Sequence, residues 1–330
     1  MKKLIFLAVS AVFLLVFDCS AGQGATYKKD SSVMGTALEV TLSAPSREEA
    51  DAAFSSVERE MKRLDSLLSE WIKTSPVSEV NRAAGKKPVK VPAELFNVIE
   101  AALRVSEVSE GAFDITWASM RGLWDFRAGY ERVPADEDVR ARLGLVDYRD
   151  VVIDPVMSTV FLKRKGMAIG LGGIAKGYAV DKAMESVLKS GIRNAIIKAG
   201  GDIRVQGRAE GSSGWEVGIQ DPRDRKRLLA KLTLTNVSIS TSGDYERFFI
   251  KGGQLYHHIM DPGTGFPATR ARSVTIIGPD TMTTDALSTA IFVLGPVKGM
   301  ALVEKLPGVE AVIVDSAGSV TSSGGIALGR

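Results

Sequence analysis

The second half of the chain carries several runs of strand-forming residues in close succession, separated by turn residues rather than helices. The runs are residues 194–205, 215–220, 228–240, 248–259, which folds back at a KGGQ turn, and 272–277. Neighbouring strands with short connections pair antiparallel, because a parallel pair needs a long crossover. The regular strand–helix alternation of a doubly wound sheet is missing. We therefore expect an α+β fold (mixed α/β), a largely antiparallel sheet with packed helices.

The most regular amphipathic helix follows Ser46, which with Glu49 fits a capping box. Its apolar positions recur at helical spacing over residues 50–71, and most are expected to face the core. Further helices are expected between Pro92 and Gly111, after "GLGGIAKG" up to Gly191, at 284–294 before Gly295, and near 297–306.

Short strands are expected at 34–42, 151–154, 160–163, 311–314 and 319–321, whereas "KTSPVSEVNRAAG" is expected to form a loop. The sequence contains no repeat, low-complexity segment or clear linker. We expect one compact domain over residues 27–330, with a smaller helical lobe around 92–150.

Residues 1–21 have the pattern of an export signal, with two lysines before an apolar run at 4–17 that is too short to span a bilayer. Cys19 directly behind this run indicates a lipoprotein that is lipidated there after cleavage. Asp18 departs from the small residue usual at that position, and simple cleavage near Ala21 is the alternative. In both cases we expect an exported, periplasmic protein, anchored to the membrane in the first. No later segment is expected to be apolar enough for a transmembrane helix.

The formal net charge is only +3, and no basic stripe with interleaved aromatic residues occurs, which argues against a nucleic-acid partner. Cys19 is the only cysteine, so an intramolecular disulfide is excluded. Zinc-type Cys/His spacing, a phosphate-loop motif and a G-x-S-x-G elbow do not occur. Three other groups of residues are candidates for chemistry.

The first group is the glycine loop "GLGGIAKG", which opens a helix. Such a loop directs several backbone N–H groups at one point, which suits a phosphate. Lys176 in the first helical turn would add a positive charge. A tight turn that packs the helix on the sheet explains the same glycines equally well.

The second group is Asp285 with Thr289, whose spacing of four places both on one helix face. A carboxylate and a hydroxyl offer hard oxygen ligands of the type that Mg²⁺ accepts beside substrate phosphates and water. The alternative, favoured by these residues taken alone, is that Thr284 or Asp285 caps the helix.

The third group is the pair His257 and His258, the only histidines, which precede a "DPGTG" turn. In a strand the two side chains point to opposite faces, so at most one is expected to face a site. There a neutral imidazole can accept a proton from an attacking hydroxyl. A hydrogen-bonded histidine at a strand end is the alternative for either one.

Eight motifs occur in order: "VMGTALEVTL", "SPVSEVNRAAG", "GAFDIT", "GLGGIAKGYAVDKA", "AGGDIRVQG", "STSGDYERFF", "HHIMDPGTGFPA" and "DALSTAIFVLG". Together they resemble the ApbE family of FAD:protein FMN transferases, from about Met34 to the C-terminus. The resemblance implies Mg²⁺-dependent transfer of FMN from FAD to a Thr or Ser hydroxyl of a client flavoprotein, as a phosphoester, with release of AMP. It also implies exported clients, such as flavoproteins of ion-pumping respiratory complexes.

The resemblance also implies residue roles. Asp285 and Thr289 match Mg²⁺ ligands, with the backbone carbonyl of Gly173 as a third. His258 matches the base for the client hydroxyl and Lys176 a contact to FAD, whereas His257 is expected to be structural. Further positions that match the FAD pocket are Met34, Trp71, Ala112, Phe113, Asp114 and Gly170.

Two positions depart from the family pattern. Gly170 stands where the family usually has an Asp that accepts hydrogen bonds from FAD. Its absence implies FAD binding weaker by roughly 1–3 kcal/mol if a buried donor is left unpaired, unless another residue takes over or weak binding has been selected. Trp71 replaces a Tyr that packs on the isoalloxazine ring, and Trp can stack too.

Two alternative functions stay open at this point. The first is an FAD pyrophosphatase that splits FAD into FMN and AMP with water as the acceptor; an aromatic residue at Trp71 favours transfer over this reaction. The second is a non-catalytic FAD-binding lipoprotein, to which Gly170 lends some weight.

Overall fold

The computed structural model describes residues 24–127 and 129–326, so the expected export signal with Cys19 lies outside the described residues. The helices are α1 (Arg47–Leu68), α2 (Pro76–Arg82), α3 (Ala93–Val108), η1 (Ile115–Met120), α4 (Asp136–Leu143), η2 (Tyr148–Asp150), α5 (Ala175–Lys189) and α6 (Thr281–Val303). The first nine strands are β1 (Ala25–Val33), β2 (Thr36–Ala44), β3 (Val89–Lys90), β4 (Val151–Asp154), β5 (Thr159–Leu162), β6 (Ala195–Ala199), β7 (Asp202–Gln206), β8 (Trp215–Asp221) and β9 (Asp224–Leu234). The others are β10 (Ser238–Gly243), β11 (Phe248–Lys251), β12 (Gln254–His257), β13 (Met260–Asp261), β14 (Phe266–Pro267), β15 (Ala271–Gly278), β16 (Glu310–Asp315) and β17 (Val320–Ser322).

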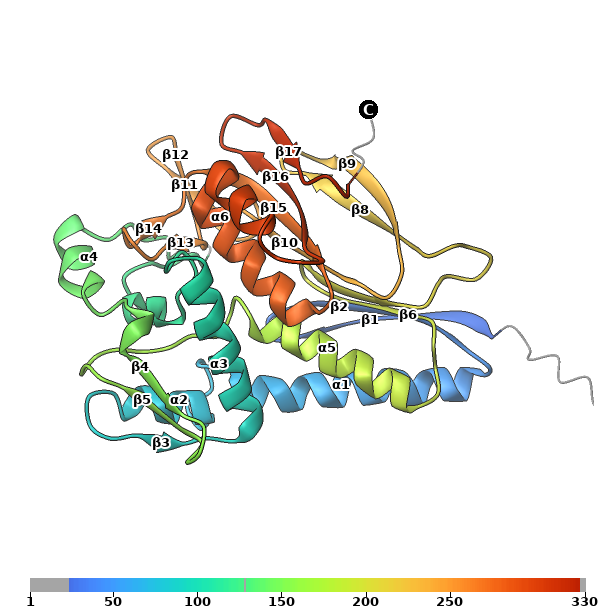
Figure 1. Cartoon of the computed structure of the whole chain (residues 1–330), viewed down its shortest axis with the longest axis horizontal. Coiled ribbons are helices and arrows are strands. Elements are labelled where there is room, and N and C mark those ends of the chain that lie inside the picture. The colour runs from blue at the N-terminus through green and yellow to red at the C-terminus, as the bar shows by residue number, and fades with distance from the viewer. Residues whose placement is uncertain (1–23, 128, 327–330) are drawn as a thin grey trace, which may run out of the picture.

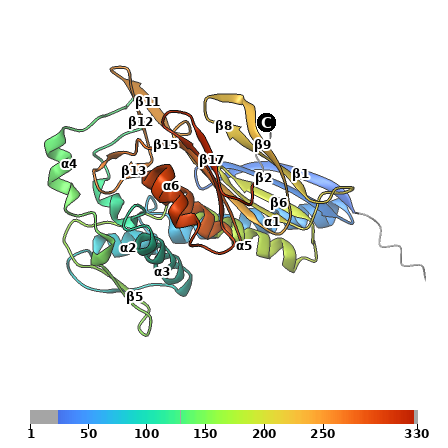
Figure 2. The same cartoon turned by 45° about the horizontal axis from the view of Figure 1, so that its top comes forward.

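The main sheet has eight strands in the order β1-β2-β6-β7-β10-β15-β16-β17, and every neighbouring pair is antiparallel. Helices α1 and α5 lie alongside one another across one face of this sheet, and α6 packs against α5, β10 and β15 (Figures 1 and 2). The hairpin β8–β9 covers apolar residues on the other face. The predicted α+β class with a largely antiparallel sheet is confirmed.

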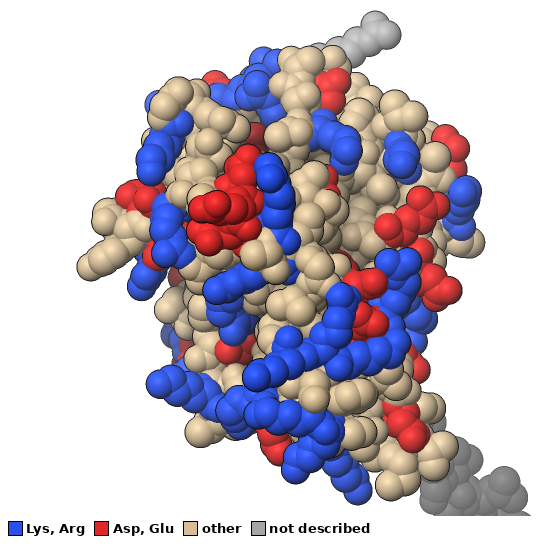
Figure 3. All heavy atoms as spheres, turned by 90° about the vertical axis from the view of Figure 1, so that its left-hand side faces the viewer, with Lys and Arg blue, Asp and Glu red and all other residues tan. Residues whose placement is uncertain are grey.

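Residues between α1 and α5 build the other side of the molecule. A three-stranded sheet in the order β3-β5-β4 lies there with α2, α3 and α4 (Figure 1). Helix α3 contributes to the same core cluster as α1, α5 and α6. A separate lobe at 92–150 therefore stays a prediction. On the surface of this side, lysine and arginine side chains gather in bands with acidic side chains between them (Figure 3).

Helix α6 is the central core helix. Among the described residues it is the one helix that is long and apolar enough to cross a membrane, with a mean hydropathy of 1.7. However, 61% of that stretch is buried in the protein. The expectation that no later segment passes this test was wrong for α6. Its apolar character serves packing on all sides, as is usual for a helix in a core. Gly295 (φ 76°) breaks the helical path before Pro296, which confirms the two predicted helices with a stop at Gly295.

The first amphipathic helix forms as predicted. Ser46 caps α1 by accepting a hydrogen bond from the backbone N–H of Glu49 at 3.2 Å. The apolar stripe is buried through Leu68, but Trp71 lies beyond the helix end with 69% of its surface exposed.

Other element boundaries differ from the predictions. The strand expected at 34–42 begins only at Thr36, because Met34 (φ 51°) and Gly35 form the turn of the β1–β2 hairpin. The polar stretch before it is strand β1, an edge strand, and charged residues are common on such edges.

Three further corrections concern turns and caps. Part of the loop expected at 73–85 is helix α2, since Ser75 caps it and Pro76 begins it. The strand expected at 194–205 is the hairpin β6–β7, which turns at Gly200 (φ 62°). The strand expected at 228–240 is interrupted between β9 and β10.

Helix α5 approaches α6 closely at Gly177. A Cβ atom there would be 2.2 Å from the carbonyl oxygen of Thr281 and 2.8 Å from Cβ of Asp285. Gly177→Ala, which would stabilise an isolated helix by about 1 kcal/mol, is therefore expected to destabilise the protein by about 1–3 kcal/mol, since the helices must separate. Urea unfolding would measure this, with Gly172→Ala as control because no atom lies within 4 Å of its added Cβ. An unchanged or raised free energy of unfolding for Gly177→Ala would contradict the close crossing.

Candidate functional site

A ladder of hydroxyl groups fixes helix α6 on strand β10. Three alternate serines of the strand, which point to the same face, each lie 2.8 Å from a hydroxyl of the helix. The pairs are Ser238–Thr281, Ser240–Thr284 and Ser242–Ser288. Two residues of strand and about one turn of helix advance by similar lengths, so the contacts repeat. The ladder sets the position of every side chain on the first turns of α6.

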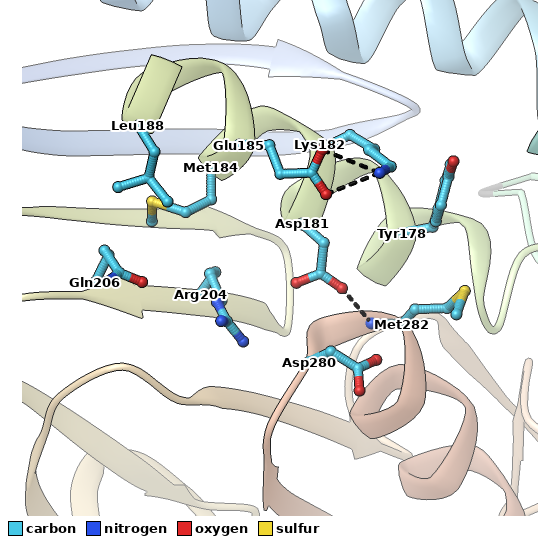
Figure 4. A pocket seen from close by; sticks show the side chains of 10 residues that line it. All are labelled: Tyr178, Asp181, Lys182, Met184, Glu185, Leu188, Arg204, Gln206, Asp280 and Met282. Atoms are coloured by element: carbon cyan, nitrogen blue, oxygen red, sulfur yellow. Dashed lines mark hydrogen bonds and ion pairs between the residues drawn. The ribbon is translucent and has the colours of Figure 1, made fainter. Parts of the chain in front are cut away.

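The start of α6 is capped by residues other than those expected. Asp280 is the N-cap and accepts from the backbone N–H of Thr283 at 2.8 Å. Asp181 of α5 accepts from the backbone N–H groups of Thr281 and Met282 (Figure 4). The helix thus begins at Thr281 rather than at 284, and capping does not explain Asp285.

Asp285 lies in a buried cluster of charges with Lys176 and Asp202. The ammonium of Lys176 is 2.9 Å from Asp202 and 3.2 Å from Asp285. Asp285 also accepts from the backbone N–H of Gly177 at 3.0 Å. Both aspartates are at most 4% exposed. The cluster joins the start of α5, the start of β7 and the second turn of α6.

Two carboxyl groups share one ammonium group in this cluster. Burial, and then the charge of Asp202, raise the pKa of Asp285 to about 7, although Lys176 acts in the opposite direction. Burial disfavours the charged form of Lys176, but Asp202 and Asp285 outweigh it and raise the pKa of the ammonium above its usual value. The surplus of acidic groups suits an additional cation.

Thr289 and Gly173 meet beside this cluster. A Cβ atom at Gly173 would lie 3.4 Å from Oγ1 of Thr289 and 3.1 Å from the ring of Phe113, so only glycine leaves this space open. Thr289 also lies 3.3 Å from Oγ of Ser242. Asp285 stands one helical turn before Thr289 on α6. A carboxylate, a hydroxyl and the backbone carbonyl of Gly173 are hard oxygen donors of the kind that Mg²⁺ accepts.

The glycine loop serves both packing and the site. Two of the N–H groups at the start of α5 are bonded within the protein, Ala175 to Leu171 and Gly177 to Asp285. The close approaches at Gly173 and Gly177 support the packing interpretation, while Lys176 carries the charge expected near a phosphate.

His257 is a structural residue. Its Nε2 lies 2.8 Å from the carbonyl oxygen of Ala268, and Nδ1 accepts from the backbone N–H of Ile259 at 3.3 Å. The ring is buried and meets Phe292 edge-on. Both nitrogens are thus occupied, which agrees with the role expected for His257.

Among the described residues, the His258 ring has one hydrogen-bond partner, and it is at Nδ1. Its Nδ1 lies 3.3 Å from the carbonyl oxygen of Arg247. A carbonyl can only accept, so Nδ1 carries the proton and Nε2 has the lone pair. Burial, and then the charges of Arg247, His257 and Lys176, lower the pKa of His258 to about 4. The ring is therefore neutral at pH 7 and can accept a proton.

The β1–β2 turn lies close to this histidine. The guanidinium of Arg247 donates to the carbonyl oxygen of Gly35 at 3.1 Å, while the Arg247 carbonyl holds His258. Met34, which precedes Gly35 in the turn, is half-buried against the core. The structure thus places the turn that carries Met34 on the residue that orients His258.

A second group of residues lies at the other end of the glycine loop. The backbone N–H of Gly170 donates to Ile115 at 2.8 Å, and the carboxyl of Glu70 fills the space beside Gly170. The guanidinium of Arg121 lies 4.6 Å from the ring centre of Trp71, whose other face is exposed.

The run from Ala112 to Asp114 has mixed roles. Phe113 lies against Gly173, and Ala112 is half-buried. The buried carboxyl of Asp114 accepts from the backbone N–H groups of Thr116 at 2.7 Å and Tyr148 at 2.8 Å. Asp114 therefore already holds η1 and η2 in place, so its side chain is committed to the fold.

Two cavities among the described residues are lined by side chains outside this charge cluster. One of about 300 Å³ opens between α5, β7 and the start of α6 and is lined by Asp181, Arg204 and Met282, among others (Figure 4). Another of about 230 Å³ lies between α3 and α6. Neither is lined by Lys176 or Asp285. The buried charges, rather than a cavity, define the candidate site.

Known proteins match this chain over most of its length. A family model described as the ApbE family matches residues 34–313. The chain belongs to the ApbE family. The identification made from the eight motifs is confirmed.

Several relatives carry a functional name. A protein of Klebsiella pneumoniae called FAD:protein FMN transferase is 34% identical over 87% of this chain and 89% of its own length. One of the same name from Treponema pallidum is 34% identical, with 91% and 87% covered. The enzyme class expected for the chain, a transferase, is the class that these names carry.

Solved structures agree with the fold. The ApbE protein of Thermotoga maritima superposes with a TM-score of 0.82 at 35% identity, covering 91% of this chain and 98% of that one. A flavinyl transferase ApbE of Pseudomonas stutzeri gives 0.80 at 29% identity, with 92% and 96% covered.

Sequence reasoning missed several residues of the site. Asp202, Ser242, Arg247, Glu70 and Arg121 were not assigned, although the first three lie in or beside motifs that carried the resemblance. A signal was present for Asp202, because an acidic residue directly after a Gly-Gly turn is placed at a strand start close to other backbone. Nothing local distinguished Glu70 from an ordinary residue at a helix end.

Proposed function

We propose that this chain is a Mg²⁺-dependent FAD:protein FMN transferase, which moves FMN from FAD to a Thr or Ser hydroxyl of a client flavoprotein and releases AMP. One observation carries the proposal: a buried cluster of Asp285, Lys176 and Asp202 shares helix α6 with Thr289, and Lys176 acts electrostatically on His258, whose Nε2 carries the lone pair. The names of the relatives support it.

His258 accepts the proton in this proposal. The client hydroxyl attacks the phosphorus that bears riboflavin, an O–P bond forms, the bond to the AMP phosphate breaks, and the hydroxyl proton goes to Nε2 of His258. The Nδ1–H bond to Arg247 fixes the tautomer that this step requires. The lowered pKa of His258 keeps the ring neutral before the attack.

Mg²⁺ would be held by Asp285, Thr289 and the carbonyl of Gly173. When bound, it would neutralise charge at the pyrophosphate oxygens. Lys176 would contact FAD while Asp202 and Asp285 hold its ammonium in position. The buried geometry means that these groups need little rearrangement on reaction, which is how phosphoryl-transfer sites lower the barrier.

Trp71 would bind the flavin ring. Its ring is exposed on one side and supported by Arg121 on the other, so it offers a flat surface for stacking. Phe113 at Gly173 and the turn that carries Met34 would form further walls of the FAD pocket.

Intact-mass spectrometry tests the proposal. A domain or peptide with an acceptor Thr is incubated with the purified protein, FAD and Mg²⁺, and AMP is followed in the same sample. A mass gain equal to FMN less water, lost on adding EDTA, is expected. FMN and AMP without an adduct would instead indicate an FAD pyrophosphatase, and FAD binding without AMP a binding protein.

We also propose that the protein is exported to the periplasm and held at the membrane by a lipid on Cys19, which would bring it to membrane-associated clients such as flavoproteins of ion-pumping respiratory complexes. The pattern of residues 1–21 supports this. Cys19→Ser is expected to move the protein from the membrane fraction to the soluble fraction, as measured by immunoblot. Equal membrane association of both forms would argue for cleavage without lipidation.

A further inference from the structure

We propose that Glu70 supplies, from the end of the first helix, a carboxylate that contacts FAD and takes the place of the aspartate expected at position 170. The inference rests on the proposed function, since it requires FAD to bind beside Trp71. It concerns binding and positioning of FAD rather than the chemical step.

The space beside Gly170 is the first observation. An added Cβ at Gly170 would lie 2.9 Å from Oε1 and 3.4 Å from Cδ of Glu70, and 3.0 Å from Cβ of Ala118. The φ angle of Gly170 is outside the left-handed region, so its backbone does not require glycine. The carboxyl of Glu70 therefore occupies the volume in which a side chain at position 170 would begin.

The second observation is that this carboxyl is buried beside Arg121. The Glu70 side chain is 5% exposed, and Nη2 of Arg121 is 3.4 Å away. Burial raises the pKa of Glu70, although its own N–H, Arg121 and the N–H of Leu171 act in the opposite direction. An ionised carboxylate offers about four acceptor positions, so beside these three donors Glu70 can still accept a further hydrogen bond.

Arg121 is under-bonded. Its Nε and Nη2 atoms are buried and have no hydrogen-bond partner among the described residues. Its guanidinium lies between Glu70 and the exposed ring of Trp71. A carboxylate that can accept a further hydrogen bond and a guanidinium with unmet hydrogen bonds thus lie next to the surface on which the flavin would stack.

The position of Glu70 is fixed by its neighbours. The hydroxyl of Ser78 in α2 and Nη1 of Arg121 donate to the backbone carbonyl oxygen of Glu70 at 3.3 and 3.4 Å. The carboxyl lies against Gly170, the first residue of the glycine loop. Gly173 and Lys176 follow Gly170 by three and six residues. In that place Glu70 can accept a hydrogen bond from an N–H or O–H group of FAD.

If Glu70 fills this place, an aspartate at position 170 weakens FAD binding instead of strengthening it. Gly170→Asp would press a second carboxylate against that of Glu70, and both contact and like charge disfavour this. The single substitution is therefore expected to weaken FAD binding, and removal of the Glu70 side chain in the same protein is expected to restore it.

The role of Glu70 is tested by comparing four proteins: the wild type, Glu70→Gln, Gly170→Asp, and Glu70→Ala combined with Gly170→Asp. FAD affinity is measured by quenching of flavin fluorescence, and folding is checked by thermal unfolding. Glu70→Gln, which keeps the shape and removes the charge, is expected to weaken FAD binding about 10- to 100-fold, as loss of a charged hydrogen bond does. Gly170→Asp is also expected to bind more weakly, and the double variant to return to within about threefold of the wild type, because neighbouring sites are coupled.

Wild-type affinity in Glu70→Gln, or tighter binding in Gly170→Asp alone, would overturn the role of Glu70. The role of Glu70 would also be overturned if the double variant bound FAD more weakly than Gly170→Asp alone. Affinity is measured without an acceptor protein. A wild type that binds FAD but transfers no FMN would therefore contradict the proposed function alone, and the order of the four affinities would still decide the role of Glu70.

Discussion

Asp285→Asn is expected to lower FMN transfer at least about 10³-fold, since losing a metal ligand removes several kcal/mol of charge stabilisation and each 1.4 kcal/mol is tenfold in rate. The change keeps the shape of the side chain. It leaves Lys176 paired with Asp202 alone, so the surplus of acidic groups that suits a divalent cation disappears. Transfer rates and Mg²⁺ affinity by calorimetry would both measure the effect.

Asp280→Asn is the matched control. It removes one acidic group from the same helix end, and asparagine caps helices as well as aspartate does. Near-normal transfer is expected for this variant. Equal losses in both variants would show that the general charge of the helix end matters rather than a site at Asp285. Transfer by Asp285→Asn at the wild-type rate would exclude Asp285 as a metal ligand.

A helix or strand could be predicted from the sequence where the residues that determine it lie within one short segment. Helix α1 was predictable because its cap and its apolar period lie within one segment. The hairpin β11–β12 and the break at Gly295 were predictable because a glycine turn is a local signal. Strand β1 was not, since its residues are polar and its pairing with β2 comes from the neighbouring strand rather than from its own pattern.

The candidate site was predictable only in part, because its chemistry comes from residues far apart in the chain. Lys176 and Asp285 are 109 residues apart, and no periodicity links them. The resemblance named both, but it gave no partner for Lys176. The structure adds Asp202 and thereby the surplus of acidic groups, which neither residue alone could indicate.

The two histidines illustrate the same limit. Alternation along a strand predicted that they point to opposite sides. It could not say which one has its nitrogens occupied, since Ala268 and Arg247 lie in other segments. The assignment of His257 to the fold depends on those contacts.

His258→Gln is expected to lower transfer about 10²–10⁴-fold, the usual range for loss of a general base, with little change in stability because the ring's one hydrogen bond among the described residues is long, at 3.3 Å. His257→Gln is the matched control with the opposite pattern. It leaves buried groups unpaired, so it is expected to lower the free energy of unfolding by about 1–3 kcal/mol and to affect transfer mainly through stability. Transfer rates and urea unfolding of both variants measure this, and equal transfer losses at equal stability would contradict the assignment of the base to His258.

The pH profile of kcat/KM gives a second, independent test of the same residue. Because the pKa of His258 is lowered to about 4, the neutral ring persists as pH falls below the usual value of 6.5, and this group should reduce the rate only as pH approaches about 4. Mg²⁺ is kept saturating so that protonation of Asp285 does not contribute. An acid limb centred near pH 6.5 that disappears in His258→Gln would show that the ring is solvated in the free enzyme and would contradict the lowered pKa. A limb near pH 4 would mean that the burial and the nearby positive charges of Arg247 and Lys176 keep the base ready in the free enzyme.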